Sequence, residues 1–239
     1  MKTLGVIGGL GPMATAYFMD LVVSMTDASC DQEHLDMIIF SRPRTPDRTG
    51  YILGRSSENP LPVMADSAKR LAAEGAGRIV IPCNTAHFFH AQVQEAAGVP
   101  VIHMIRETVS YLKEHGIEKA GIMATDGTIE TGLYQKELEE NGIGWVVPSA
   151  EGQKKVMHLI YENVKAGRPP EMELFYEVNR ELQGAGAQAV LMACTELSVI
   201  KKQYDLGNGI LDALEVLAKC AVEQCGAPLR AEYRELITK

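Results

Sequence analysis

The stretch GAGRIVIPCNT, residues 75–85, carries an apolar run that ends on a cysteine, and GAGAQAVLMACTE, residues 184–196, repeats this arrangement. Each stretch begins with Gly-Ala-Gly, and in each the cysteine is followed by small polar or acidic residues. Short continuous apolar runs are typical of strands that are covered on both faces, as in a parallel sheet. The two stretches therefore predict that Cys83 and Cys194 lie at the carboxyl ends of two buried strands.

The rest of the chain predicts strands that alternate with helices. Amphipathic segments separate the short apolar runs, and four of these segments end at a glycine (Gly75, Gly116, Gly142 and Gly167), as helices often do. This order predicts an α/β fold with doubly wound parallel sheets. The expected strands are Thr3–Gly8, Asp36–Ser41, Arg78–Pro82, Val99–Ile102, Lys119–Ala124, Gly144–Pro148 and Ala189–Ala193.

The repeat extends beyond the cysteines. GVIG at residues 5–8 aligns with GIMA at residues 121–124, an offset of 116 (121 minus 5), and the cysteines align at an offset of 111 (194 minus 83). Two similar lobes are therefore expected, one of residues 1–98 plus 208–239 and the other of residues 99–207. Open α/β sheets bind ligands beyond the carboxyl ends of their strands, so Cys83 and Cys194 should meet across one cleft.

Composition limits the expected partners and location. The chain has 239 residues and a net charge of −8, without the basic stripe that nucleic-acid binding requires. No apolar stretch approaches the ~20 residues that cross a bilayer, so no membrane partner is expected. The first residues do not resemble a leader peptide, which favours a cytoplasmic location with reduced cysteines.

Two thiols on opposite sides of one carbon atom can invert the configuration of that atom. One sulfur takes a proton from one face and the other returns a proton to the opposite face, which requires one thiolate and one thiol. Asn84, Thr85 and Thr195 flank the cysteines and can donate hydrogen bonds to a carboxylate and to the charge that develops beside it. Cysteine is also a common buried packing residue. Cys30, Cys220 and Cys225 lack the context of the two motifs, and Cys220 and Cys225, in an amphipathic segment, are interpreted as packing residues.

Four motifs resemble those of the aspartate/glutamate racemase family, in particular its cofactor-independent aspartate racemase branch. They are GVIGGLGP at residues 5–12, PDRTGYIL at 46–53, IPCNTAH at 81–87 and ACTEL at 193–197. The resemblance covers essentially the whole chain. It implies an enzyme of two α/β domains, without pyridoxal phosphate or metal, that inverts the α-carbon of an acidic amino acid with Cys83 and Cys194 as acid and base. It also suggests a homodimer.

The resemblance further implies two cations for the distal carboxylate of the substrate, Arg48 in PDR and Lys165 in YENVKAG. Leu10, Thr49, Thr125 and Glu196 complete the expected substrate site. Two additional arginines, Arg42 and Arg44, leave the choice between aspartate, glutamate and cysteate open, and the enantiomer that each cysteine serves also stays open.

Competing interpretations concern cofactors and function. GLGPMA at residues 9–14 fits a dinucleotide-binding motif, but Pro12 removes an N–H from the phosphate cradle and the second strand is not followed by an acidic residue. Cys83, His87 and His90 lack a fourth metal ligand. The remaining alternatives are a maleate isomerase-like or arylmalonate decarboxylase-like enzyme and a small-molecule binding protein.

Overall fold

Two parallel sheets form the framework of this computed structural model, which describes residues 1–238. The first sheet has the order β2 (Met37–Ser41), β1 (Leu4–Gly8), β3 (Arg78–Val80), and all its strands are parallel. The second has the order β5 (Gly144–Val146), β4 (Lys119–Ala124), β6 (Ala189–Ala193), β7 (Ile210–Asp212). Because β1 and β4 take the same central place, the predicted pair of similar α/β lobes is confirmed.

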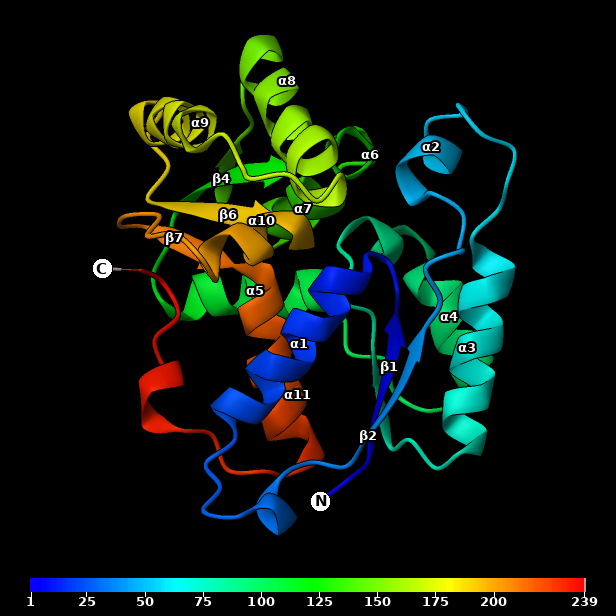
Figure 1. The fold of residues 1–239 in the computed structure, drawn as a ribbon. Coiled ribbons are helices and arrows are strands. Elements are labelled where there is room, and N and C mark those ends of the chain that lie inside the picture. Colours follow the sequence, from blue (N-terminus) through cyan, green and yellow to red (C-terminus); the bar gives the residue numbers. More distant parts are fainter. Residues whose placement is uncertain (239) are drawn as a thin grey trace.

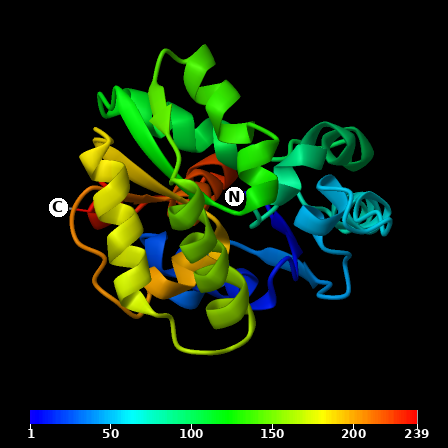
Figure 2. The same ribbon diagram turned by 90° about the horizontal axis from the view of Figure 1, so that it is seen from above.

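Helices cover both faces of each sheet (Figures 1 and 2). In the first lobe α3 (Leu61–Ala73) and α4 (His90–Ala97) lie on the outer face, and α8 (Ala150–His158) and α9 (Met172–Gly184) do so in the second. Between the sheets, α11 (Ala213–Cys225) packs against α1 (Pro12–Met25) and α5 (Met104–Glu114). The other helical segments are η1 (Asp31–Glu33), α2 (Arg48–Ile52), η2 (Thr85–Phe89), α6 (Asp126–Glu130), α7 (Leu133–Glu140), η3 (Leu159–Lys165), α10 (Thr195–Lys201) and η4 (Ala231–Tyr233).

Side-chain alternation along the strands builds three cores. Leu4 and Val6 of β1 and Ile122 of β4 point into one central core that the lobes share. Ile7 points instead to the core under α3 and α4, and Met123 to the core under α8 and α9. Each strand is thus apolar on both faces, which explains the continuous apolar runs of the sequence.

Two glycines at corresponding positions let the outer helices approach the sheets. A Cβ at Gly5 would lie 3.3 Å from Leu71 Cβ of α3 and 2.9 Å from Ala76 Cβ in the turn that follows α3, and one at Gly121 would lie 3.0 Å from Leu182 Cβ of α9. Both positions therefore require glycine for close packing rather than for backbone conformation. The repeat seen in the sequence thus has a packing role at the same place in each lobe.

Two details differ from the sequence-based expectations, and one expectation about the helix ends is confirmed. Residues 99–102 do not form a strand, because only Val101 makes an isolated parallel bridge to Ile79. The sequence analysis missed β7, which pairs with β6 and extends the second sheet to Asp212, beyond the expected boundary at residue 208. The four glycines expected to end helices do have positive φ angles.

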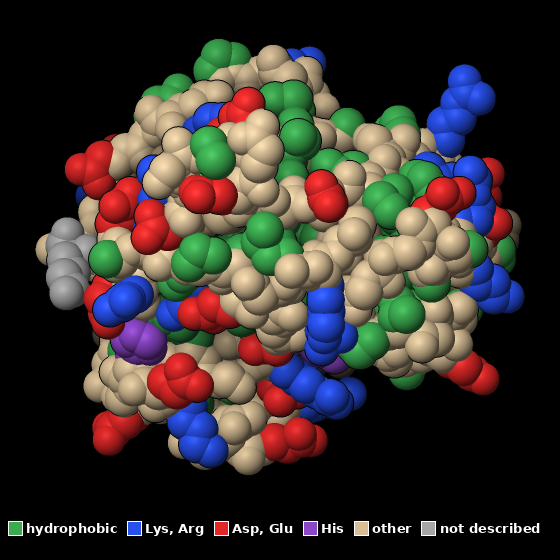
Figure 3. All heavy atoms as spheres, turned by 90° about the horizontal axis from the view of Figure 1, so that it is seen from below, with side chains coloured by type: hydrophobic (Ala, Val, Ile, Leu, Met, Phe, Trp, Pro, Cys, Tyr) green, Lys and Arg blue, Asp and Glu red, His purple; other side chains and the backbone are tan. Residues whose placement is uncertain are grey.

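Charged side chains of both signs are interspersed over the face of the molecule seen in Figure 3. Such mixing is ordinary for the surface of a globular domain. Among residues 1–238, no helix combines the length and the apolar character needed to cross a bilayer.

Candidate active site

One small cavity between the lobes brings together all the residues that the sequence analysis selected. It is lined from the first lobe and from the second. The space is so tight that it holds about one water molecule. The lining residues are Leu10, Asp47, Arg48, Thr49, Cys83, Asn84, Thr85, Thr125, Lys165, Cys194, Thr195 and Glu196.

The two cysteines occupy corresponding positions in the two lobes. Cys83 follows β3, which pairs with β1, and Cys194 directly follows β6, which pairs with β4. Cys194 is also the N-terminal cap residue of α10. Both residues are nearly buried, with 6% and 5% of their surfaces exposed, yet both line the cavity. The strand ends therefore deliver one thiol from each lobe to the same space.

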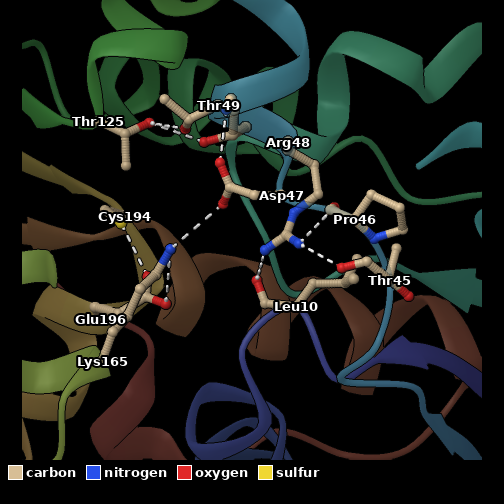
Figure 4. Close-up of polar contacts among 12 residues, drawn as sticks. Leu10, Thr45, Pro46, Asp47, Arg48, Thr49, Thr125, Lys165, Cys194 and Glu196 are labelled. Atoms are coloured by element: carbon tan, nitrogen blue, oxygen red, sulfur yellow. Dashed lines mark hydrogen bonds and ion pairs between the residues drawn. The ribbon is translucent and has the colours of Figure 1, made fainter. Parts of the chain in front are cut away.

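Cys194 is held as a neutral thiol. Its Sγ donates a hydrogen bond to Glu196 Oε2 at 3.0 Å (Figure 4). Burial and the negative charge of Glu196 raise the pKa of Cys194 well above that of a free thiol, although Lys165 acts in the opposite direction. Near neutral pH this sulfur therefore carries its proton.

Arg48 faces the other cysteine, although most of its hydrogen bonds go to the backbone. Nη1 donates to the carbonyl oxygens of Thr45 and Pro46 at 3.4 and 3.0 Å, and Nη2 donates to that of Leu10 at 3.1 Å. Nε is buried without a partner among the described residues. Burial lowers the pKa of Arg48, but the charges of Cys83 and Asp47 outweigh it, and the pKa is raised. A permanent cation thus lies beside Cys83.

Lys165 lies at the end of the π-helical segment η3 and reaches into the cavity from the second lobe. Its Nζ is 3.9 Å from Glu196 Oε1 and 4.0 Å from Asp47 Oδ1, and it lies 4.0 Å from the ring centroid of Tyr161. Burial lowers the pKa of Lys165, but Glu196 and the other nearby anionic groups outweigh it and raise the pKa. Lys165 is therefore charged and loosely paired with two carboxylates.

A tyrosine of the second lobe orients Asn84 of the first. The Tyr134 hydroxyl donates to Asn84 Oδ1 at 2.5 Å, and Tyr134 itself is fully buried. Asn84 Nδ2 is buried without a partner among the described residues. An unpaired buried N–H group is costly unless a ligand accepts from it, so this amide is suited to a carboxylate oxygen.

Buried threonine hydroxyls join the lobes beside the cavity. Thr85 Oγ1 lies 2.9 Å from both Thr125 Oγ1 and Thr128 Oγ1. Thr49 Oγ1 adds a longer contact of 3.4 Å to Thr125 Oγ1 (Figure 4). Each hydroxyl can both donate and accept a hydrogen bond, so the threonines can serve as one another's partners. One of these hydroxyls can also donate its proton to a ligand in the cavity.

His87 supports the cysteine loop. Its Nε2 accepts from Met104 N at 3.1 Å, so Nδ1 carries the proton and donates to the Cys83 carbonyl oxygen at 2.9 Å. Burial lowers its pKa to about 4, which keeps the ring neutral. Both ring nitrogens are thus used within the protein. Within residues 1–238, no three His, Cys, Asp or Glu side chains are grouped closely enough to hold a metal ion.

Sequence reasoning missed three residues of this site, namely Asp47, Thr128 and Tyr134. Asp47 stands next to Arg48 in the PDR motif and could have been selected on that ground. Tyr134 belongs to an ordinary amphipathic helix, α7, and nothing in its sequence context marks it. The additional Arg42 is directed elsewhere, since its Nη1 pairs with Asp66 of α3 at 2.6 Å.

The arrangement is suited to proton transfer at a carbon atom next to a carboxylate. A cation stands beside one sulfur, while a carboxylate holds the proton on the other. Asn84 Nδ2, which has no partner among the described residues, is a donor of the kind that stabilises a carboxylate whose charge grows.

The chain is similar to known racemases over nearly its whole length. The family model described as Asp/Glu/Hydantoin racemase matches residues 7–221. The broad-specificity amino-acid racemase RacX of Bacillus subtilis (strain 168) is 28% identical over 225 residues, which are 92% of this chain and 96% of that protein.

Two solved structures have the same fold. The aspartate racemase of Picrophilus torridus superposes with a TM-score of 0.83 and 31% identity, over 98% of each chain. An aspartate racemase homologue from Pyrococcus horikoshii OT3 superposes with a TM-score of 0.75 and 25% identity, over 94% of this chain and 99% of that one.

Proposed function

Because this chain is an amino-acid racemase that belongs to the Asp/Glu/hydantoin racemase family, we propose that its substrate is an acidic amino acid, aspartate first and glutamate second. The observation that supports a two-base reaction is that Cys83 and Cys194 line one cavity from corresponding positions in two lobes. The reaction needs no cofactor in this proposal, since the two sulfurs supply both the acid and the base.

The proposed reaction begins with a thiolate at Cys83 and a thiol at Cys194. The cation of Arg48 lies beside Cys83, and Glu196 accepts a hydrogen bond from the thiol of Cys194. The Cys83 thiolate takes the α-proton, so an S–H bond forms as the C–H bond breaks. The Cys194 thiol then gives its proton to the opposite face of the carbon, and the product leaves with inverted configuration.

The charge that develops between these steps spreads into the α-carboxylate. The unpaired Nδ2 of Asn84 and the hydroxyl of Thr85 are the donors proposed to stabilise it. The proton arrangement is reversed after one turnover, with Cys83 as the thiol and Cys194 as the thiolate. The same two sulfurs can therefore catalyse the reaction in the opposite direction.

The choice of an acidic substrate rests on the two cations at the cavity, Arg48 and Lys165. The relative from Picrophilus torridus is an aspartate racemase, whereas the relative from Bacillus subtilis is a racemase of broad specificity. A two-base scheme does not depend on this choice, because both cysteines act at the α-carbon and not at the side chain.

The test is to incubate the purified protein separately with each common L-amino acid and to quantify both enantiomers by chiral chromatography. We expect conversion of aspartate, with glutamate slower, and no loss of activity with a metal chelator or a carbonyl reagent. Conversion of neutral amino acids alone would contradict the substrate proposal. Inactivation by the chelator or the carbonyl reagent would contradict cofactor independence.

A further inference from the structure

Asp47 is the one charged residue of the cavity to which the reaction scheme gives no role. It comes from the loop before α2 in the first lobe, and its Oδ1 lies 4.0 Å from Lys165 Nζ of the second lobe (Figure 4). Its other oxygen, Oδ2, accepts a hydrogen bond from Gly50 N at 2.6 Å and so caps α2. One oxygen of Asp47 is thus structural, and the other contacts a substrate-binding cation.

Lys165 is the cation that a second substrate carboxylate can reach most directly. Arg48 already donates to three backbone carbonyl oxygens, whereas the two carboxylates beside Lys165 lie 3.9 and 4.0 Å away. These distances exceed those of hydrogen bonds, which lie near 2.7–3.2 Å for N–H···O contacts, so both pairs are loose. A carboxylate that forms true hydrogen bonds to Lys165 would bind it more tightly than either partner does.

The two partners of Lys165 differ in how easily they can be displaced. Glu196 is 8% exposed at its side chain and is also held by the Cys194 thiol. Asp47 is 45% exposed at its side chain, so its free oxygen can turn to water at little cost. Of the two carboxylates, Asp47 is therefore the one that an entering carboxylate displaces more easily.

We infer that Asp47 is a specificity-determining residue whose carboxylate occupies Lys165 until the side-chain carboxylate of the substrate replaces it. The charges of Arg48, Lys165, Asp47 and Glu196 cancel, so Asp47 reduces the attraction of the empty site for anions. An acidic ligand has to displace this ion pair, whereas a neutral ligand does not. The inference rests on the proposed function for the identity of the substrate, but not for the binding of a dicarboxylate.

The decisive variant is Asp47→Asn, because asparagine caps a helix as well as aspartate does but carries no charge. The matched control is Asp126→Asn, which removes the same charge from another long pair between the lobes, that of Arg55 and Asp126 at 3.9 Å. Asp126 does not line the cavity. The probe is succinate, whose binding is measured by calorimetry and requires no turnover.

We expect Asp47→Asn to lower the dissociation constant of succinate about threefold, because succinate no longer competes with an exposed ion pair for Lys165. Asp126→Asn should leave this dissociation constant unchanged. The KM for L-aspartate should fall by a similar factor in Asp47→Asn. An unchanged or raised dissociation constant in Asp47→Asn, or no succinate binding to either protein, would overturn the inference. Tighter succinate binding without any racemase activity would refute the proposed function alone.

Discussion

The hydroxyl of Tyr134 donates to Asn84 Oδ1 at 2.5 Å, across the boundary between the two lobes. An amide held by its oxygen has its nitrogen directed away from the tyrosine, and Asn84, at the cavity, indeed has an Nδ2 without a partner among residues 1–238. The bond therefore determines which end of the amide a ligand meets, and it does so only when the lobes are packed together.

Tyr134→Phe should leave the ring packing intact and free the Asn84 amide to rotate. We expect KM to rise about fivefold, because one hydrogen bond of about 1 kcal/mol no longer orients the donor. Steady-state kinetics and thermal unfolding provide the two measurements. Tyr111→Phe is the control, because it removes another buried hydroxyl that does not line the cavity. That hydroxyl accepts a hydrogen bond from Leu236 N at 2.6 Å. An equal rise of KM in both variants would argue against the orienting role.

Glu196→Gln should lower the pKa of Cys194. The neutral amide keeps the shape of the glutamate but removes the negative charge that, after burial, contributes most to the raised pKa. The rate of Cys194 alkylation by iodoacetamide, followed against pH by mass spectrometry, should therefore reach its midpoint at lower pH than in the wild type.

The control for this experiment is Glu107→Gln, because Glu107 accepts from a different thiol, that of Cys220, at 3.5 Å. It should leave the Cys194 alkylation profile unchanged. If Glu196→Gln also leaves the profile unchanged, Glu196 does not hold the proton on Cys194.

Arg48→Lys should destabilise the protein as well as impair catalysis. A lysine has one nitrogen in place of three and cannot serve the carbonyl oxygens of Leu10, Thr45 and Pro46 together. We expect the free energy of unfolding to fall by about 2 kcal/mol in denaturant titrations. Arg42→Lys should lower the free energy of unfolding far less, because Arg42 pairs with the half-exposed Asp66, at 2.6 Å. Equal losses would mean that the backbone contacts of Arg48 contribute little.

Stability should fall as the pH drops below about 6.5, the usual pKa of histidine. Burial lowers the pKa of His87 to about 4 and that of His103 to about 3, so the unfolded chain binds protons that the folded chain does not. Each such histidine adds a slope of up to about 1.4 kcal/mol per pH unit between its two pKa values.

His103→Asn isolates one of these contributions. His103 caps α5 by accepting from Arg106 N at 3.3 Å, and asparagine can accept the same bond without titrating. Denaturant titrations between pH 4 and 6.5 should therefore show a shallower dependence of stability on pH in this variant, because this range lies between the lowered pKa of His103, about 3, and the usual histidine value. If the stability of the variant depends on pH as steeply as that of the wild type, groups other than His103 cause the dependence.

The sequence was sufficient to predict the framework because the central strands are continuous apolar runs, covered on both faces. Gly5 and Gly121 mark the same packing position in each lobe, and Cys83 and Cys194 mark the same strand end. From these matches, the two-lobed α/β fold could be predicted, and the selected site residues do meet in one cavity.

Features that depend on tertiary packing could not be predicted in this way. The strand β7 has only three residues, ILD, and exists because β6 offers it an edge. The orienting bond of Tyr134 depends on how α7 docks against the first lobe, and α7 carries no signal of it. The pairing of Asp47 with Lys165 likewise joins residues 118 positions apart (165 minus 47).

The most direct measurement of the two-base scheme is α-hydrogen exchange in deuterated water, made with Cys83→Ser and Cys194→Ser on each enantiomer of aspartate separately. With one sulfur left, a variant should exchange the α-hydrogen of one enantiomer without inverting it, and the two variants should select opposite enantiomers. If both variants exchange the same enantiomer, or if either still racemises aspartate at the wild-type rate, the two cysteines do not act from opposite faces of the α-carbon.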